Sequence, residues 1–258
     1  MKSIFSTFLI IFPALIFSQS NIVVQYSHNS STSNIKKSKT IVLYANNERA
    51  KQVHSKSQIN DKNEYGTRLN DDGSITIIEE PTDYNNVWFY KVSTNDVVKS
   101  VKNLKSNFII YDQDLKYNWE ITDEIDSIGQ YQVIKALTNF RGRTFIAWFT
   151  PSIPISFGPW KLKGLPGLIL KMYDQEQKYT WSVRKLILNA EFSEDTLKPT
   201  ISEYAEEMTY QEALELSNQL MNEKSRIRNT KLSGRGNNFK TVRHRDKELE
   251  REYEWEEN

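Results

Sequence analysis

Short runs of β-branched and aromatic residues, separated by polar turn-forming residues, recur through the first two thirds of the chain. Such runs predict β-strands, and they fall at residues 22–26, 41–44, 74–78, 87–92 and 108–111. Apolar and polar residues alternate at 117–121 and again at 179–183, which predicts strands with one buried and one exposed face. Turn signals at 71–73 and 127–129 separate neighbouring strands. Residues 22–188 therefore predict an antiparallel, meander-like sheet that curls.

One run differs from the others because it is apolar on both faces. Residues 144–149 contain five consecutive apolar side chains, from Phe145 to Phe149. A strand with two apolar faces is typical of a position where both sides of the sheet are covered. We expect this strand near the middle of the sheet.

A helix is predicted after the strands. Thr209 and Glu212 form a capping-box pattern, and the apolar residues that follow recur at helical spacing. These are Ala213, Leu214, Leu216, Leu220 and Met221. The helix is expected over 209–226, with its apolar stripe covering one face of the curled sheet; docking on a membrane surface is the alternative. The predicted fold class is thus mainly β with one or more C-terminal helices.

The C-terminal residues change abruptly in charge. No acidic residue occurs in 224–245, which holds eight arginines and lysines, whereas 246–257 holds seven acidic residues. We expect a charged, partly flexible tail at 229–258. Pairing of the two blocks, or binding of an anionic lipid or polysaccharide by the basic block, are the alternatives. Alternation near the end predicts a last edge strand at 249–256.

The first twenty residues have the pattern of an export signal. A short positive start is followed by an apolar stretch at 4–17 and by small polar residues at 18–20, which predicts a secretory signal peptide. The apolar stretch is shorter than the roughly 20 residues that a membrane-spanning helix needs. We therefore expect a signal peptide at 1–20, a β-rich domain at 21–228 and the charged tail.

The composition limits the chemistry. The chain has 258 residues, with 34 Lys and Arg against 33 Asp and Glu, so its net charge of +1 gives no field that would attract nucleic acid. The absence of cysteine excludes thiol catalysis, disulfides and zinc–thiolate sites. The closest acidic pairs, Asp71 with Asp72 and Asp112 with Asp114, lie at predicted turns or strand ends, where aspartate is common. We predict no catalytic residue, cofactor, metal or nucleic-acid partner.

Proline and glycine concentrate in one segment. The chain has 9 glycines and 7 prolines, and seven of these residues lie within 151–167. They are Pro151, Pro154, Gly158, Pro159, Gly164, Pro166 and Gly167. Residues 165–168 fit a type II turn, in which proline presets φ at the second position and glycine supplies a positive φ at the third. The prolines favour a loop of fixed shape that leads into a strand at 168–173.

This part of the chain resembles a known family. The most specific motif is the hexapeptide Gly164-Leu165-Pro166-Gly167-Leu168-Ile169. The other motifs are Arg141-Gly142-Arg143, Ala147-Trp148-Phe149-Thr150, Ile153-Pro154-Ile155 and Gly158-Pro159. With these motifs, residues 105–185 resemble the GLPGLI family of secreted Bacteroidetes proteins. The resemblance implies a periplasmic or exported location in a Gram-negative envelope, and it implies no reaction. Many members carry a cysteine where this chain has residues 131–136 without one, so no disulfide is implied here.

The strand pattern is also similar, in architecture alone, to the half-barrel of periplasmic lipoprotein carriers, in which a curled sheet clasps a lipid or peptide. Function does not follow from such a similarity.

Four side chains are candidates for binding a ligand. Arg141 and Arg143 are placed to clamp a carboxylate or phosphate, or else to form structural ion pairs with Asp174 or another carboxylate. Trp148 and Trp160 are candidates to line a glycan or lipid site, although tryptophans at strand spacing more often belong to a core. Trp160 is the stronger candidate because it lies in the loop.

Three classes of function remain open. The first is an exported, non-catalytic protein that binds an apolar or amphipathic ligand (lipid, peptide or glycan) on the curled sheet. The second is a structural protein that binds envelope proteins through edge strands and the tail. The third is an enzyme, which has the least support because no catalytic constellation is present. A deep apolar cavity would favour the first class, a filled core with an exposed proline loop the second, and a buried carboxylate pair in a cleft the third.

Overall fold

The computed structural model describes residues 21–32, 35–54, 66–69, 75–78, 86–91, 93–94, 96–102, 107–199, 205–232 and 248–256. The predicted signal peptide at 1–20 and the predicted turn at 71–73 lie outside these residues, as does the part of the predicted tail at 233–247.

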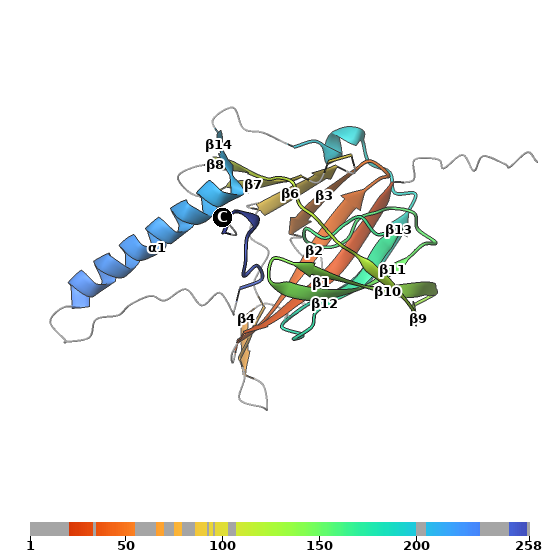
Figure 1. Cartoon of the computed structure of the whole chain (residues 1–258), viewed down its shortest axis with the longest axis horizontal. Coiled ribbons are helices and arrows are strands. Elements are labelled where there is room, and N and C mark those ends of the chain that lie inside the picture. Colours follow the sequence, from red (N-terminus) through yellow and green to blue (C-terminus); the bar gives the residue numbers. More distant parts are fainter. Residues whose placement is uncertain are drawn as a thin grey trace, which may run out of the picture.

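Within the described residues, the strands form one curled sheet (Figure 1). The strands are β1 (Ile22–Thr32), β2 (Ile35–Ala45), β3 (Arg49–His54), β4 (Gly66–Leu69), β5 (Ile75–Ile78), β6 (Asn86–Lys91), β7 (Val97–Lys102), β8 (Asn107–Asp112), β9 (Glu120–Ile128), β10 (Tyr131–Phe140), β11 (Arg143–Thr150), β12 (Leu168–Asp174), β13 (Tyr179–Leu188) and β14 (Ala205–Thr209). Their order in the sheet is β14-β8-β7-β6-β3-β2-β1-β13-β12-β11-β10-β9, with β5 paired to β2 and β4 paired to β5. Neighbours are antiparallel except for β14 with β8 and β2 with β5. The predicted fold class, a mainly β chain with a curled antiparallel sheet and a helix near its end, is confirmed.

Strand β1 pairs with β2 on one side and with β13 on the other. It therefore joins the half of the sheet that runs from β2 to β14 to the half that runs from β13 to β9. Strand β11 lies third from the β9 edge, so the prediction that 144–149 lies near the middle of the sheet is wrong. Both faces of β11 are nevertheless buried, which explains why both are apolar. Phe145 and Phe149 belong to the main core, and Ile146, on the opposite face, is also buried.

The Pro- and Gly-rich segment 151–167 fills the inside of the curl. Six of its apolar side chains are buried in the main core together with residues from both halves of the sheet. They are Ile153, Ile155, Phe157, Trp160, Leu162 and Leu165. The apolar side chains of this loop are therefore part of the core, whereas Pro151, Ser152, Pro154, Gly164 and Pro166 are exposed.

Side chains of the surrounding residues satisfy the backbone of this buried segment and of the strand that follows it. Tyr26 on β1 donates its hydroxyl to the carbonyl of Ile169 (2.7 Å), and Tyr117 donates to the carbonyl of Lys161 (2.7 Å). A buried loop would otherwise leave unpaired polar groups, which are costly. Further bonds of this kind join Trp119 to Lys163, Gln52 to Trp160 and Tyr90 to Trp160.

The predicted type II turn at 165–168 is wrong. The N–H of Gly167 donates to the carbonyl of Leu165 (2.8 Å), which closes a three-residue turn centred on the proline. Gly167 has a φ of 159°, far from the value of about 80° that a type II turn needs. The N–H of Leu168 bonds instead to the carbonyl of Ile153 (3.0 Å), so contact with the start of the loop sets this geometry.

Helix α1 (Tyr210–Leu232) follows β14 and extends beyond the predicted range of 209–226. Its capping box is confirmed, because the N–H of Thr209 donates to the Glu212 carboxylate (2.7 Å) and the N–H of Glu212 donates to the Thr209 hydroxyl (3.2 Å). The predicted role as a cover for the sheet is wrong. The helix leaves the edge of the sheet and runs away from the body (Figure 1), and none of its described side chains is buried.

Two predicted strands differ from the structure. Residues 117–119 form no strand, because their aromatic side chains bond to the loop inside the curl, and β9 begins only at Glu120. The segment 248–256 is not an edge strand; it ends in the 3₁₀ helix η4 (Glu254–Glu256). Another 3₁₀ helix, η1 (Glu194–Leu197), follows β13.

Candidate functional site

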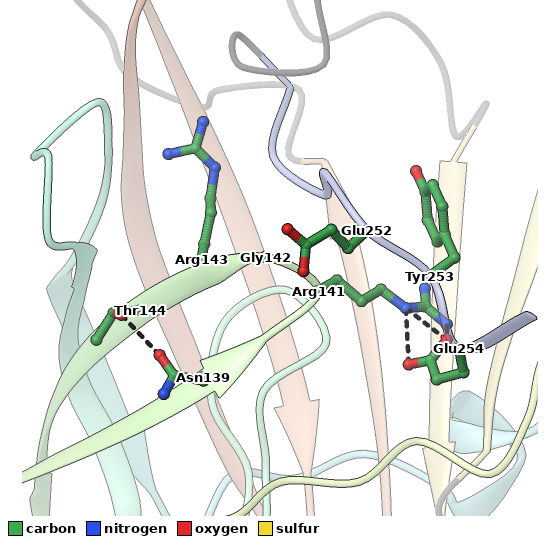
Figure 2. Close-up of a pocket in the computed structure, with 8 residues that line it drawn as sticks. All are labelled: Asn139, Arg141, Gly142, Arg143, Thr144, Glu252, Tyr253 and Glu254. Atoms are coloured by element: carbon green, nitrogen blue, oxygen red, sulfur yellow. Dashed lines mark hydrogen bonds and ion pairs between the residues drawn. The ribbon is translucent and has the colours of Figure 1, made fainter. Parts of the chain in front are cut away.

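A pocket of about 340 Å³ opens at the turn between β10 and β11, where the C-terminal segment 248–256 packs (Figure 2). A hollow of about 130 Å³ beside it shares Gly142, Arg143 and Thr144. The lining residues of the larger pocket are Asn139, Arg141, Gly142, Arg143, Thr144, Glu252, Tyr253 and Glu254. The fold thus brings both candidate arginines together with residues from the end of the chain.

The pocket is built on a tight hairpin turn. Phe140 pairs with Arg143, so Arg141 and Gly142 form a two-residue loop. Their φ angles are 46° and 73°, and a type I′ turn requires positive φ at both positions. A non-glycine residue in this region costs about 1 kcal/mol of backbone energy. The contacts of the Arg141 side chain hold it there.

The guanidinium of Arg141 is buried among carboxylates. It donates to Asp112 (2.7 and 3.0 Å), to Glu250 (2.7 Å) and to Glu254 (3.1 Å). Burial acts to lower the pKa of Arg141, but the hydrogen bonds and charges of these carboxylates outweigh it, and its pKa is raised. The guanidinium also lies 5.0 to 5.5 Å from the centroids of four aromatic rings, which favours the cation further. The rings belong to Phe140, Tyr210, Tyr253 and Trp255.

Lys161 enters the same cluster from the loop inside the curl. Its ammonium donates to Asp112 (2.5 Å) and to Glu250 (2.6 Å), and it lies 3.8 Å from the ring centroid of Tyr210. Burial acts to raise the pKa of Glu250, but the charges of Lys161 and Arg141 outweigh it and hold the pKa below its usual value. Two buried cations and two buried carboxylates therefore compensate one another, and Glu250 is poorly suited to act as a general acid.

Arg143 has separate partners. Its guanidinium donates to the Asp174 carboxylate (2.5 Å) and to the backbone carbonyl of Glu248 (2.7 Å). The ion pair predicted between an arginine and Asp174 is confirmed. The two arginine side chains point in different directions, Arg141 toward Glu254 and Arg143 away from it (Figure 2), so they do not converge on one anion.

The residues that face the open side of the pocket are polar. The Thr144 hydroxyl donates to the amide oxygen of Asn139 (2.7 Å). Glu252 lies over Gly142, where a Cβ atom would stand 2.9 Å from the Glu252 carboxyl carbon. Glu254 is half-exposed. Because the arginine charges are compensated internally, the pocket offers amide, hydroxyl and carboxylate groups without an excess of positive charge.

The candidate tryptophans lie elsewhere. Trp148 is half-buried on β11, outside the pocket. Trp160 is in the core and 7% exposed, so the expectation that it faces a ligand is not supported by its position. Its backbone has a φ of 59°, and its ring stacks on that of Trp181 with the centroids 6.1 Å apart.

The hexapeptide of the family resemblance is structural. Leu165, Leu168 and Ile169 are buried in the core. A Cβ atom on Gly158 would stand 2.6 Å from the Cδ1 atom of Ile169, so these two motifs pack directly against each other. Gly164, Pro166, Pro154 and Pro159 belong to the same packed loop and do not line the pocket.

The sequence predicted Asp174 as a partner of an arginine, but it did not identify most of the residues that surround Arg141. Lys161, Tyr210, Glu250 and Glu254 carry the cluster, and none of them was singled out. The one local signal was the alternation of glutamates with aromatic residues near the end of the chain, which was interpreted as an edge strand.

Among the residues that the structure describes, no three acidic or histidine side chains are grouped as a metal site. In that same part of the chain, no helix combines the length and the apolar character needed to cross a membrane.

One family model matches part of the chain. The family model described as "Protein of unknown function (Porph_ging)" matches residues 139–171, which include the β10–β11 turn and the hexapeptide. No curated protein matches the chain.

Solved structures share the fold at low identity. Two crystal forms of PNGF-II match with TM-scores of 0.52 and 0.53 at 16% and 17% identity, covering 77% and 75% of this chain. The chain spans about a third of PNGF-II (33% and 32%). A putative outer membrane lipoprotein-sorting protein domain from Vibrio parahaemolyticus matches 69% of this chain and 89% of its own at 8% identity, with a TM-score of only 0.26. The PNGF-II likeness concerns the fold alone.

Proposed function

We propose that the protein is an exported, non-catalytic binding protein of the cell envelope, and that it binds a neutral polar ligand of the glycan class in the pocket at the β10–β11 turn. The observation that carries the proposal is the pocket itself, whose cationic side chains are already paired within the protein while its open side carries an amide, a hydroxyl and carboxylates. Export rests on the pattern of residues 1–20 and on the resemblance to secreted GLPGLI proteins.

The chemistry of the pocket favours a sugar over the other ligands expected from the sequence. Sugar hydroxyl groups both donate and accept hydrogen bonds, and the side chains of Asn139, Thr144 and Glu252 offer both functions. A phosphate or carboxylate would meet Glu252 and Glu254 and would have to compete with Asp112 and Asp174 for the arginines. A lipid inside the curl would have to displace the segment 151–167. The volume of about 340 Å³ lies within the range of small-molecule sites.

The test is a screen of neutral and acidic oligosaccharides on an array, followed by titration calorimetry. We expect a neutral oligosaccharide to bind, and the Asn139→Ala and Thr144→Val variants to bind about tenfold more weakly, because each loses one hydrogen bond. Thr196→Val in η1, outside the pocket, is the matched control and should bind like the wild type. Binding that survives both pocket substitutions, or binding of anionic lipid vesicles instead, would refute the proposal.

A second candidate function is the binding of an envelope protein through the edge strand β9. The sheet pairs β9 on one side with β10. Ile121 and Ile125 on this strand are exposed, beside Asp123 and Asp126. An extended partner segment with basic side chains would add a strand to this edge and meet these acidic residues. Titration of a lysine- and valine-alternating peptide, with Ile125→Pro as the variant that should abolish binding, tests this candidate.

A further inference from the structure

The C-terminal segment 248–256 is attached to the body without strand pairing in the described part of the chain. It packs on the β10–β11 turn (Figure 2), where its backbone is bound at two points. The Arg143 guanidinium donates to the carbonyl of Glu248 (2.7 Å), and the N–H of Arg251 donates to the carbonyl of Arg141 (2.9 Å). The segment therefore lies against the body in the manner of a bound peptide.

Glu250 is the buried anchor of this segment. Its carboxylate accepts hydrogen bonds from Arg141 (2.7 Å) and Lys161 (2.6 Å), and a third from the hydroxyl of Tyr210. The three donors come from the β10–β11 turn, from the loop inside the curl and from the start of α1. Elements that are separate from the segment thus converge on one carboxylate of it.

Two aromatic residues of the segment add a second point of recognition. Tyr253 and Trp255 stack on each other with their ring centroids 4.8 Å apart, and both rings lie within 6.3 Å of Tyr210. Both rings also lie over the Arg141 guanidinium, at 5.3 and 5.5 Å. Glu254, between them in the sequence, accepts from the same guanidinium (3.1 Å). The segment therefore presents a glutamate, followed three positions later by the sequence Tyr-Glu-Trp.

This mode of attachment favours specificity over stability. Burial of ionised groups costs free energy, and apolar residues of similar volume often hold a chain segment equally well. A segment without the matching carboxylate would leave Arg141 and Lys161 with one buried carboxylate, Asp112, between them. Such a segment is rejected, because buried cations require compensation. Recognition of acidic motifs by clusters of basic residues follows the same principle.

We infer that Arg141, Arg143, Lys161 and Tyr210 form a docking surface for an acidic, aromatic segment of a second protein chain, and that the chain's own segment 248–256 occupies this surface as a built-in competitor. Covalent attachment gives the chain's own segment a high effective concentration. A partner therefore enters when it binds more tightly or when the chain's own segment is released. Exchange breaks no strand pairing of the described segment. The inference does not rest on the proposed glycan ligand, because it needs no molecule in the pocket.

A fluorescent peptide of residues 248–256 is the probe, and its anisotropy with the full-length chain measures binding. The Glu250→Gln chain, whose own segment is held less tightly, should bind the peptide saturably. The wild-type chain should bind it at least about tenfold more weakly, because its own segment competes. The peptide should also raise the melting temperature of the Glu250→Gln chain and leave that of the wild type almost unchanged. Absence of binding up to about 1 mM peptide, with a Glu250→Gln chain that circular dichroism shows to be folded, would overturn the proposal.

Two altered peptides distinguish recognition from general charge attraction. The Glu250→Gln peptide should bind at least about a hundredfold more weakly than the parent peptide, because Arg141 and Lys161 lose the carboxylate that they share. The Glu252→Gln peptide loses the same charge from an exposed side chain and is the matched control, which should bind like the parent. Equal weakening by both substitutions would overturn the assignment of the docking surface.

A protease site introduced within residues 233–247 gives a measurement that leaves the contacts of the segment unchanged. After cleavage the segment should remain bound, and an excess of labelled peptide should replace it while the body stays folded. If the segment does not exchange, or if the body unfolds when it leaves, 248–256 is a fixed part of the fold and the proposal is wrong.

A partner segment has two sources, a second copy of this chain or a different envelope protein. Sedimentation of a mixture of wild-type and Glu250→Gln chains distinguishes them. A complex of the two chains identifies the second copy as the donor. Two chains that sediment separately, although the peptide binds, assign the docking surface to a segment of a different protein.

Discussion

Gly167 lies directly against the backbone of Thr150, so that a Cβ atom on Gly167 would stand 2.2 Å from the Thr150 carbonyl oxygen and 2.7 Å from its carbonyl carbon. This close approach joins the end of the loop inside the curl to the end of β11. Gly167→Ala should therefore lower the free energy of unfolding by about 2 kcal/mol, since the backbone must move apart to admit the methyl group. Urea unfolding followed by tryptophan fluorescence measures the loss.

The matched control for this prediction is Gly129→Asn. Gly129 has a φ of 60° and no atom within 4 Å of its would-be Cβ, and asparagine tolerates this backbone region. This variant should lose less than about 1 kcal/mol. Equal losses in the two variants would show that close approach is not what requires glycine at 167.

Features that depend on neighbours along the chain could be predicted from the sequence. The capping box of Thr209 and Glu212 spans four residues, and the strand at 144–149 is set by its own apolar side chains. The burial of the loop could not be predicted in this way. Lys161 is buried because it meets Glu250, which lies 89 positions away, and a lysine without such a partner is normally exposed. Because these partners lie so far apart along the chain, the charge cluster at the candidate site could not be predicted from the sequence either.

A buried carboxylate and a half-exposed one bind the same arginine, which allows a direct comparison of their contributions. Glu250 is 7% exposed and bonds to both Arg141 and Lys161, whereas Glu254 is 52% exposed and bonds to Arg141. Glu250→Gln should cost about 3 kcal/mol of stability, because it leaves two buried cations undercompensated. Glu254→Gln should cost less than about 1 kcal/mol, since water screens that pair.

Limited proteolysis gives a second readout for the same pair of variants. Loss of the Glu250 charge should release the segment 248–256 from the β10–β11 turn, so that cleavage there becomes faster than in the wild type. Glu254→Gln should be cleaved at nearly the wild-type rate. If the two variants prove equally stable and equally resistant, the cluster does not hold the C-terminal segment in place.

The lowered pKa of Glu250 predicts acid sensitivity. The folded protein holds this pKa below the unfolded value of about 4.3, so the stabilisation is present above that pH and is lost as the pH falls through the folded pKa. The free energy of unfolding of the wild type should therefore decline below about pH 4, and the decline should be shallower in Glu250→Gln. Urea titrations at a series of acidic pH values measure both slopes, and parallel curves would contradict the assignment.

Buried tyrosines predict a corresponding loss at alkaline pH. Burial raises the pKa of Tyr26, whose hydroxyl donates to the carbonyl of Ile169 inside the core. Because the unfolded tyrosine ionises near pH 10 and the folded one does not, the unfolded state binds fewer protons above that pH, and stability falls as the pH rises. Tyr26→Phe should cost about 1 to 2 kcal/mol at neutral pH, since the Ile169 carbonyl loses its donor, and its deficit against the wild type should shrink above about pH 10. Tyr131→Phe is the control: the Tyr131 hydroxyl accepts a hydrogen bond from the exposed Gln130 side chain (3.2 Å), and this variant should be nearly as stable as the wild type at neutral pH. A Tyr26→Phe deficit that stays constant through the alkaline range would show that the Tyr26 hydroxyl ionises as readily in the folded protein as in the unfolded chain.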